Sequence, residues 1–322
     1  MLISELKVPL TTDMAAVDAA IRASLTSDVA LVSQIAEHII AAGGKRLRPV
    51  LLLLVARALG YKGPKAHELA AVVELIHTAT LLHDDVVDES DLRRGRKTAN
   101  AMFGNAASVL VGDFLYSRSF QMMVGAGSME VMQVLSEATN VIAEGEVLQL
   151  MNIGNAEVSE AEYLQVVRYK TAKLFEAAAR LGAIVAGADA PTKAKMAEYG
   201  MRLGTAFQLI DDVLDYAGNA DDTGKNAGDD LAEGKPTLPL LRVLSCGTPE
   251  QSAAARLAIA NPGAASFAVV FDAIRASGAL DYTRQAAQAE AALAAAAVAS
   301  LPDSEHKQSL LQLCVVAIER SS

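Results

Sequence analysis

Residues 69–88 read LAAVVELIHTATLLHDDVVD, and this stretch decides the fold class. Its apolar side chains recur every three or four residues, which places them on one face of an α-helix. They are Leu69, Val72, Ile76, Ala79 and Leu82. The same spacing recurs along almost the whole chain, whereas the strict alternation typical of strands is scarce. The sequence therefore predicts an all-α fold, organised as one helical domain over residues 1–322.

Composition excludes several classes of protein. Hydrophobic residues make up 52% of the 322 residues, which is enough apolar surface for a core and excludes wholesale disorder. The net charge of −10 argues against a nucleic-acid-binding protein, which needs a basic face. Cys246 and Cys314 cannot form a disulfide framework and match no zinc motif. The apolar run 50–56 is far shorter than the ~20 residues of a membrane span, so we expect a cytoplasmic protein without a transmembrane segment.

Capping residues and helix breakers set the expected element boundaries. Ser159 and Glu162 form a capping box that opens a helix, and Pro49 suits the first residue of another. The polar, Gly- and Asp-rich residues 218–236 form the longest loop, and we expect it to act as a lid. Helices are expected near 14–42, 49–60, 69–82, 107–123, 129–151, 160–186, 191–216, 238–245, 249–260, 265–277, 281–301 and 304–320.

Two Asp-Asp-x-x-Asp motifs follow apolar helical runs, at 84–88 and at 211–215. Asp84 and Asp88 lie four residues apart on a helix, so their side chains leave the same face about 5–6 Å apart. Such carboxylates repel one another unless a cation lies between them, and Mg²⁺ prefers one or two carboxylates with water and substrate phosphates. Solvated acidic helix ends are the alternative. The duplication favours two helices that face each other across a cavity and hold metal ions.

Positive charge is concentrated in two short stretches. GGKRLRP at 43–49 and RRGRK at 93–97 hold seven of the 28 Lys and Arg residues. Guanidinium groups match phosphate oxygens in a bidentate manner, and a helix N-terminus favours anions. We interpret these stretches as two phosphate-binding sites, which imply two phosphorylated substrates, with Arg46, Arg96 and Lys97 as ordinary surface charge.

The substrates implied by these groups carry a charged head and an apolar tail. Neither a P-loop nor a dinucleotide-binding Gly-x-Gly-x-x-Gly is present, which argues against nucleotide-dependent chemistry. Apolar helices lead into both aspartate motifs, which indicates a ligand with a charged head and an apolar tail.

The chain resembles the trans-isoprenyl (polyprenyl) diphosphate synthases, most closely their octaprenyl-forming bacterial branch. The resemblance covers nearly the whole chain. It rests on GGKRLRP at 43–49, HTATLLHDDVVDESDLRRG at 77–95, GNAASVLVGDF at 104–114, VIAEGEVLQLMN at 141–152, KTAKLFEAAA at 170–179, GTAFQLIDDVLDY at 204–216 and GDDLAEGKPTLPLL at 228–241. It implies a helical bundle around a central cavity, and a homodimer.

The resemblance also implies a role for each site residue. Isopentenyl diphosphate would be bound by Lys45, Arg48, His77 and Arg94. The allylic diphosphate would be bound by Arg93, Lys170, Thr171, Gln208, Lys225 and Lys235. The catalytic aspartates would be Asp84, Asp85, Asp88, Asp211, Asp212 and Asp215. Of these, Asp84, Asp88, Asp211 and Asp215 would ligate two to three Mg²⁺ ions. His83 is interpreted as structural.

The reaction implied is chain elongation without a protein nucleophile. The allylic diphosphate leaves, the double bond of isopentenyl diphosphate attacks the allylic cation, and a proton is lost. Repetition gives a long all-trans polyprenyl diphosphate, octaprenyl for a quinone side chain.

Product length is expected to depend on small residues that precede Asp84 on the same helix. Ala79 and Thr80 precede Asp84 by roughly 6–7.5 Å at 1.5 Å per residue. Their size would leave a tunnel open, with Phe120 or Met123 as its floor. The alternative is that Ala79 is only a helix-packing contact.

Three other functions are alternatives to this one. A shorter-chain farnesyl or geranylgeranyl synthase is the nearest. A non-catalytic subunit of a heteromeric synthase usually lacks the aspartate motifs, which are intact here. A class I terpene cyclase usually has a second metal motif that mixes Asn, Ser and Glu.

Overall fold

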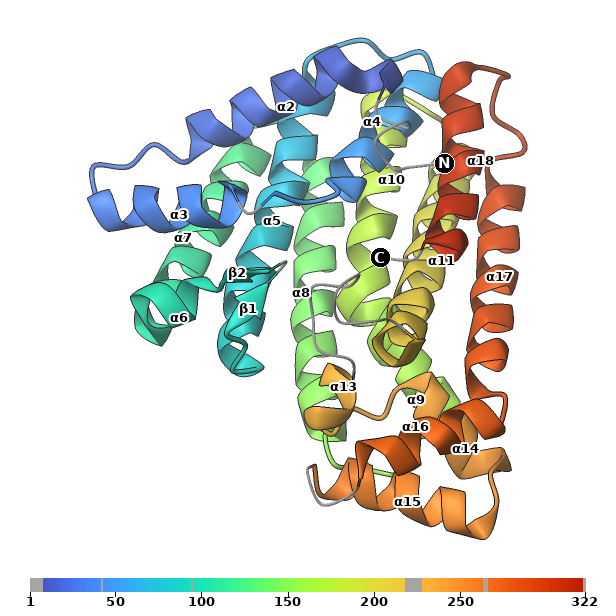
Figure 1. The fold of residues 1–322 in the computed structure, drawn as a ribbon. Helices are drawn as coiled ribbons and strands as arrows, with labels where there is room; N and C mark the ends of the chain where they lie inside the picture. Colours follow the sequence, from blue (N-terminus) through green and yellow to red (C-terminus); the bar gives the residue numbers. More distant parts are fainter. Residues whose placement is uncertain (1–7, 42, 94, 218–227, 263–265, 321–322) are drawn as a thin grey trace. The chain divides into compact units, whose positions relative to one another are not determined.

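The computed structural model describes residues 8–41, 43–93, 95–217, 228–262 and 266–320. These residues are almost entirely helical, as Figure 1 shows, so the all-α prediction is confirmed. The exception is a two-stranded hairpin of β1 (Leu92–Arg93) and β2 (Arg96–Lys97), in which Leu92 pairs with Lys97.

The helices follow one another along the chain. They are the 3₁₀ turn η1 (Val8–Leu10), α2 (Thr11–Ser24), α3 (Ala30–Ala41), α4 (Leu47–Ala58), α5 (Lys65–Val87), α6 (Ala99–Phe103), α7 (Asn105–Gly125), α8 (Met129–Asn152), α9 (Glu160–Val166), the π-helical turn η2 (Val167–Ala172), α10 (Lys173–Val185), α11 (Ala190–Ala217), α13 (Asp229–Ala232), α14 (Leu238–Cys246), α15 (Pro249–Ala260), α16 (Phe267–Ala276), α17 (Ala279–Ala297) and α18 (Glu305–Glu319).

Contacts divide the chain into two compact units. The first comprises 1–139, 174–200 and 297–313, and the second comprises 140–173, 201–296 and 314–322. Several helices, such as α8 and α11, pass from one unit into the other. The single domain over 1–322 stays a prediction.

The core of the first unit forms around α4 and α5. Residues 50–56 of α4 are fully buried on every side, as expected of a helix that is apolar all round. Helix α5 packs against α2, α4 and α7 (Figure 1). Because its predicted apolar stripe is buried, the position of the acidic residues at its C-terminal end is fixed by this core.

Two expected boundaries in the first unit are wrong. The helix expected over 14–42 is broken after Ser24, and α3 starts at Ala30, because Thr26, Ser27 and Asp28 favour turns over helix interiors. Helix α4 starts at Leu47 rather than at Pro49. Proline is still tolerated there, because it lies in the first turn, where backbone N–H groups have no partner within the helix.

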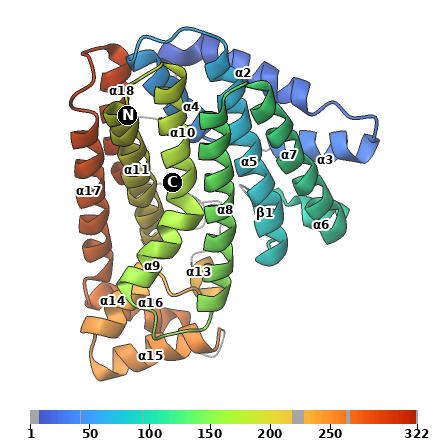
Figure 2. The same ribbon diagram turned by 180° about the vertical axis from the view of Figure 1, so that it is seen from behind.

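Two apolar clusters of described residues lie in the second unit. Helices α14, α15 and α16 pack together with Tyr216 and Leu231 in one (Figure 2). Val158, Tyr163, Leu209, Leu238 and Ala287 contribute to the other. The predicted capping box is confirmed: Ser159 Oγ accepts from the Glu162 backbone, and the Glu162 side chain accepts from the Ser159 N–H.

The helix expected over 160–186 is interrupted by η2. At this turn the backbone of Lys170 approaches Gly145 of α8, where a Cβ atom would lie 2.6 Å from the Lys170 nitrogen. A side chain at position 145 would clash, so glycine permits this close approach. π-helical turns occur frequently at functional sites.

Among the described residues, no helix is long and apolar enough to cross a membrane.

Candidate functional site

The first aspartate motif lies at the C-terminal end of α5. Asp84 and Asp85 are in its last turn and Asp88 is its C-cap, with the Asp88 N–H donating to the Asp84 carbonyl at 2.8 Å. The last turn of α5 contains no basic residue. Carboxylates at this end are disfavoured by the helix dipole, so the motif is a place where a cation is favoured.

The three aspartates of this motif differ in exposure. Asp84 and Asp88 are partly exposed, but Asp85 is fully buried. Arg93 Nη2 lies 2.6 Å from Asp85 Oδ1, and Arg93 Nε donates to the same carboxylate at 2.9 Å. The middle aspartate therefore anchors the β1–β2 hairpin to α5, whereas the outer two remain partly exposed to solvent.

The GGKRLRP segment leads into the first turn of α4. Arg46 is its N-cap residue, Arg48 lies two residues inside the helix, and Lys45 precedes it. The Arg48 guanidinium lies 4.4 Å from the centre of the Phe175 ring. Arg48 and the N-terminal end of α4 thus form an anion-favouring surface.

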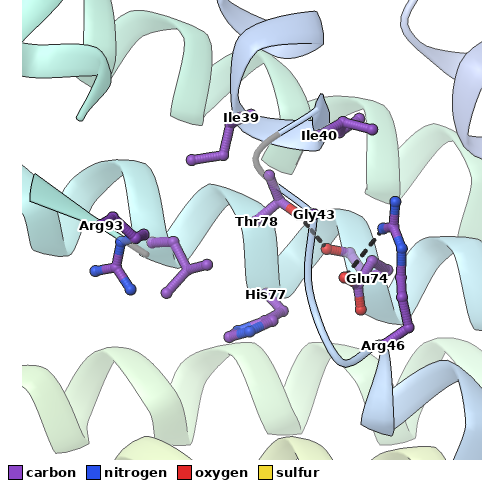
Figure 3. Close-up of a pocket in the computed structure, with 9 residues that line it drawn as sticks. Ile39, Ile40, Gly43, Arg46, Glu74, His77, Thr78 and Arg93 are labelled. Carbon is purple, nitrogen blue, oxygen red and sulfur yellow. Dashed lines mark hydrogen bonds and ion pairs between the residues drawn. The ribbon is translucent and has the colours of Figure 1, made fainter. Parts of the chain in front are cut away.

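A cavity in the first unit brings several of these elements together. Figure 3 shows its lining, which comprises Ile39, Ile40, Gly43, Arg46, Glu74, His77, Thr78, Leu81 and Arg93. His77 and Arg93, expected at different diphosphates, line this one cavity. Arg46, expected on the surface, has a side chain only 14% exposed and is bound to Glu74, so that expectation is wrong.

The second aspartate motif lies near the C-terminal end of α11. Asp211 is 43% exposed at its side chain and pairs with Arg320, whose Nη2 lies 2.6 Å from Asp211 Oδ1. Arg320 is itself almost buried, with its guanidinium 3.6 Å from the centre of the Phe207 ring. A residue near the C-terminus thus fixes the first carboxylate of this motif.

The middle aspartate of the second motif is again buried. Asp212 accepts hydrogen bonds from the Tyr163 hydroxyl and from Gln208 Nε2, the latter at 2.9 Å. Gln208 Oε1 in turn accepts from Thr171 Oγ1 at 3.0 Å. Burial raises the pKa of Asp212 to about 8, and the negative charge of Asp230 adds to this effect. Hydrogen bonds thus connect η2 to the second motif.

The last aspartate of this motif caps a short helix. Asp215 accepts from the backbone N–H groups of Asp229 and Asp230 at 3.2 and 3.3 Å, which holds α13 beside it. Lys235 follows α13 and pairs with Glu233.

Lys170 of η2 pairs with Glu146 of α8, with Nζ 2.6 Å from Oε2. Its neighbour Thr171 belongs to the Asp212 hydrogen-bond chain, so η2 contains two of the six residues expected at the allylic diphosphate.

The outer aspartates suit Mg²⁺. Within the described parts of the chain, no three His, Cys, Asp or Glu side chains converge on a single ion position. Mg²⁺ does not need them, because it is usually held by one or two carboxylates and keeps waters and substrate phosphates as its other ligands. Asp84 with Asp88 at the end of α5, and Asp211 with Asp215 in the last two turns of α11, are the candidates for such oxygen pairs.

Sequence reasoning missed several residues of these sites, and two predicted ones cannot be placed. Arg94 and Lys225, with most of the expected lid at 218–236, lie outside the described residues. The missed residues are Glu74, Tyr163, Asp230 and Arg320. Only Glu74 left a signal in the sequence, because it is a charged residue on an apolar helix, one turn before His77.

A family model for polyprenyl synthetase matches residues 29–274, which is more than half of the chain. The chain belongs to the polyprenyl synthetase family. It is 54% identical over 309 residues to the octaprenyl diphosphate synthase of Escherichia coli, covering 96% of both chains. It is 44% identical to an all-trans-nonaprenyl-diphosphate synthase of Rhodobacter capsulatus, covering 98% of this chain and 97% of the relative.

Solved structures of this family superpose on the whole chain. The polyprenyl synthase of Caulobacter crescentus, in complex with calcium and isoprenyl diphosphate, has a TM-score of 0.95 and 45% identity, covering 100% of this chain and 98% of that one. A decaprenyl diphosphate synthase of Rhodobacter capsulatus has a TM-score of 0.94 and 45% identity over the full length of both chains. This polyprenyl synthetase is therefore a prenyltransferase with the isoprenoid-synthase helical fold.

Proposed function

We propose that this polyprenyl synthetase condenses isopentenyl diphosphate with an allylic diphosphate to make octaprenyl diphosphate for a quinone side chain. The observation that carries the proposal is the 54% identity, over nearly all of both chains, to an octaprenyl diphosphate synthase. Both aspartate motifs are intact, which disfavours a non-catalytic subunit. A geranylgeranyl synthase is less similar, at 27% identity.

Binding of the first substrate is assigned to the first unit. Lys45, Arg48 and His77, with Arg94, would hold the diphosphate of isopentenyl diphosphate, because charge-assisted hydrogen bonds to phosphate are strong. The cation–π contact of Arg48 with Phe175 supports this role, since it holds the guanidinium in one orientation.

Binding of the allylic diphosphate is assigned mainly to η2 and α11. Lys170, Thr171 and Gln208 would contact it, together with Arg93, Lys225 and Lys235. The hydrogen bond from Thr171 to Gln208 supports a shared site, since it brings these two side chains together. These groups would orient the diphosphate as it leaves and stabilise its growing negative charge.

The metal sites are assigned to the outer aspartates of each motif. Asp84, Asp88, Asp211 and Asp215 would hold two to three Mg²⁺ ions, while Asp85 and Asp212 would keep their motifs in position. When bound, Mg²⁺ would supply electrostatic stabilisation for the leaving diphosphate. The residues fit this role through partial exposure, oxygen donors and position at helix ends.

The chain-length residues are Ala79, Thr80, Phe120 and Met123. Ala79 and Met123 are buried, whereas Thr80 and Phe120 are partly buried. A growing apolar chain would be stabilised along such surfaces, at about 0.8 kcal/mol for each buried CH₂ group.

The homodimer is supported by an apolar stripe on α8. Val147, Leu150 and Met151 are 56–71% exposed there and share one helix face. The cytoplasmic location stays a prediction.

The purified chain tests this function directly when supplied with isopentenyl diphosphate, farnesyl diphosphate and Mg²⁺. Diphosphate release should require both substrates and the metal. It should fall about a hundredfold or more in Asp84→Ala and Asp211→Ala, because each loses stabilisation of the leaving group. Lys45→Ala should raise mainly the KM for isopentenyl diphosphate. Full turnover in chelator, or by either aspartate variant, would contradict the proposal.

A further inference from the structure

Arg46 has an unusual backbone conformation. Its φ is 51°, in the left-handed region, and only Glu89 shares a positive φ among the described non-glycine residues. This conformation is unfavourable for a residue with a side chain. Glycine would adopt it freely, so the side chain of Arg46 must contribute something that glycine cannot.

That contribution is a buried ion pair. Arg46 Nη1 lies 3.0 Å from Glu74 Oε1, and the two side chains are only 14% and 10% exposed. Arg46 Nη2 also lies 3.5 Å from Asp18 Oδ1, but the Asp18 side chain is 50% exposed. Solvent screens the contact with Asp18, so the pair with Glu74 is the dominant attachment.

The pair joins the two segments that bear the proposed ligands of isopentenyl diphosphate. Arg46 lies between Lys45 and Arg48, and Glu74 lies one helical turn before His77 on α5. Figure 3 shows Arg46 and Glu74 in contact at the cavity that His77 also lines. A movement of Arg46 would therefore shift Lys45 relative to both Arg48 and His77.

We propose that Glu74 and Arg46 are positioning residues for isopentenyl diphosphate. The Glu74 carboxylate neutralises the charge of Arg46 and holds its guanidinium against α5. As a result, Lys45 and Arg48 bind the diphosphate, whereas Arg46 does not. This inference rests on the proposed function, because it takes Lys45, Arg48 and His77 as the diphosphate ligands.

A double-mutant cycle separates positioning from direct binding. Glu74→Gln, Arg46→Gln and the double variant are compared by steady-state kinetics and thermal unfolding. We expect each single variant to raise the KM for isopentenyl diphosphate by about tenfold to a hundredfold, since a small displacement of ligands has effects of this size. We expect kcat and the KM for the allylic substrate to change less than about twofold, because those groups keep their positions. The double variant should be no worse than either single variant, as expected of two residues that act as one unit.

Two further variants serve as controls. Asp18→Asn removes the exposed partner of the same guanidinium and should leave the kinetics unchanged. Arg46→Gly can adopt the left-handed backbone conformation but lacks the side chain. It should therefore raise the KM for isopentenyl diphosphate as Arg46→Gln does. It replaces Arg46→Gln in the kinetic comparison if backbone strain at position 46 prevents that variant from folding.

Each outcome decides between the explanations. If Arg46 binds the diphosphate directly, Glu74→Gln will leave the KM unchanged or lower it, and the inference is wrong. An unchanged KM in Arg46→Gly also overturns it. If the wild-type protein does not consume isopentenyl diphosphate at all, the proposed function itself is wrong.

Discussion

Arg93 binds the carboxylate of Asp85 through two nitrogens, with Nη2 2.6 Å and Nε 2.9 Å from Oδ1, and Asp85 is fully buried. The bidentate pair ties the β1–β2 hairpin to the end of α5. The second motif also has a buried middle aspartate, since Asp212 is buried and bound to Tyr163. The middle aspartate of each motif therefore has a structural role that differs from the role of the outer aspartates, and substitutions should distinguish the two roles.

Asp85→Asn should destabilise the protein by about 3 kcal/mol, because it leaves the partly buried Arg93 without its anion. Asp84→Asn should destabilise the protein less than Asp85→Asn does, because the Asp84 side chain is partly exposed and solvent screens its charge. Both should lose activity. Urea unfolding measures the stability of each variant, and a turnover assay measures its activity. An Asp84→Asn variant as unstable as Asp85→Asn would show that the two carboxylates do not differ in this way.

Gly145→Ala should distort η2, because the added Cβ would lie 2.6 Å from the Lys170 nitrogen. We expect a loss of about 1–3 kcal/mol from overpacking, and a higher KM for the allylic diphosphate. Gly125→Ala is the matched control, since no atom beyond its chain neighbours and its own helix backbone lies within 4 Å of the added Cβ. Normal allylic kinetics in a folded Gly145→Ala enzyme would exclude a role for this close approach.

Asp13 should stabilise the fold in a pH-dependent manner. Burial raises the pKa of Asp13, but hydrogen bonds and charges from Arg57 and His67 lower it by more, so it lies below the usual 3.8. A lowered pKa stabilises the folded state above pH 3.8, and this stabilisation is lost as pH falls through the folded-state pKa.

We therefore expect Asp13→Asn to cost about 2 kcal/mol at pH 7, where charged hydrogen bonds are lost. The difference from wild type should shrink below pH 4. Denaturant unfolding between pH 7 and pH 3 measures it, with the exposed Asp281→Asn as a control. A difference that is constant over this range would refute the assignment.

Ala79→Tyr should shorten the product by several isoprene units, because a ring would block the path of the tail about 7.5 Å below Asp84. The site is fully buried, so some loss of stability is expected. Ala79→Ser, which stays small, should keep the wild-type product. A long product from a folded, active Ala79→Tyr enzyme would mean that Ala79 is a packing contact.

Local patterns predicted the elements, because helix periodicity and caps act over a few residues. The Ser159–Glu162 capping box is an example. The turn η2 could not be predicted, because it accompanies a contact with Gly145, on another helix. The structural roles of Asp85 and Asp212 could not be predicted from the sequence either, because the burial of a carboxylate depends on the residues that pack around it in the fold.

Contacts between residues that are distant in the sequence are the other part of the site that could not be predicted. Glu74 and Arg46 are 28 residues apart, and Arg320 reaches Asp211 from the last described residue. Spacing along one helix cannot indicate such pairs. It can indicate only residues about one helical turn apart, such as Asp84 and Asp88, whose shared metal site stays a prediction.

Mass spectrometry of the prenyl products tests the central claim most directly. The wild-type protein is supplied with isopentenyl diphosphate, farnesyl diphosphate and Mg²⁺, and the extracted products are measured after full conversion. We predict octaprenyl diphosphate as the main product. A product that stops at farnesyl or geranylgeranyl length, or no elongation, would contradict the account.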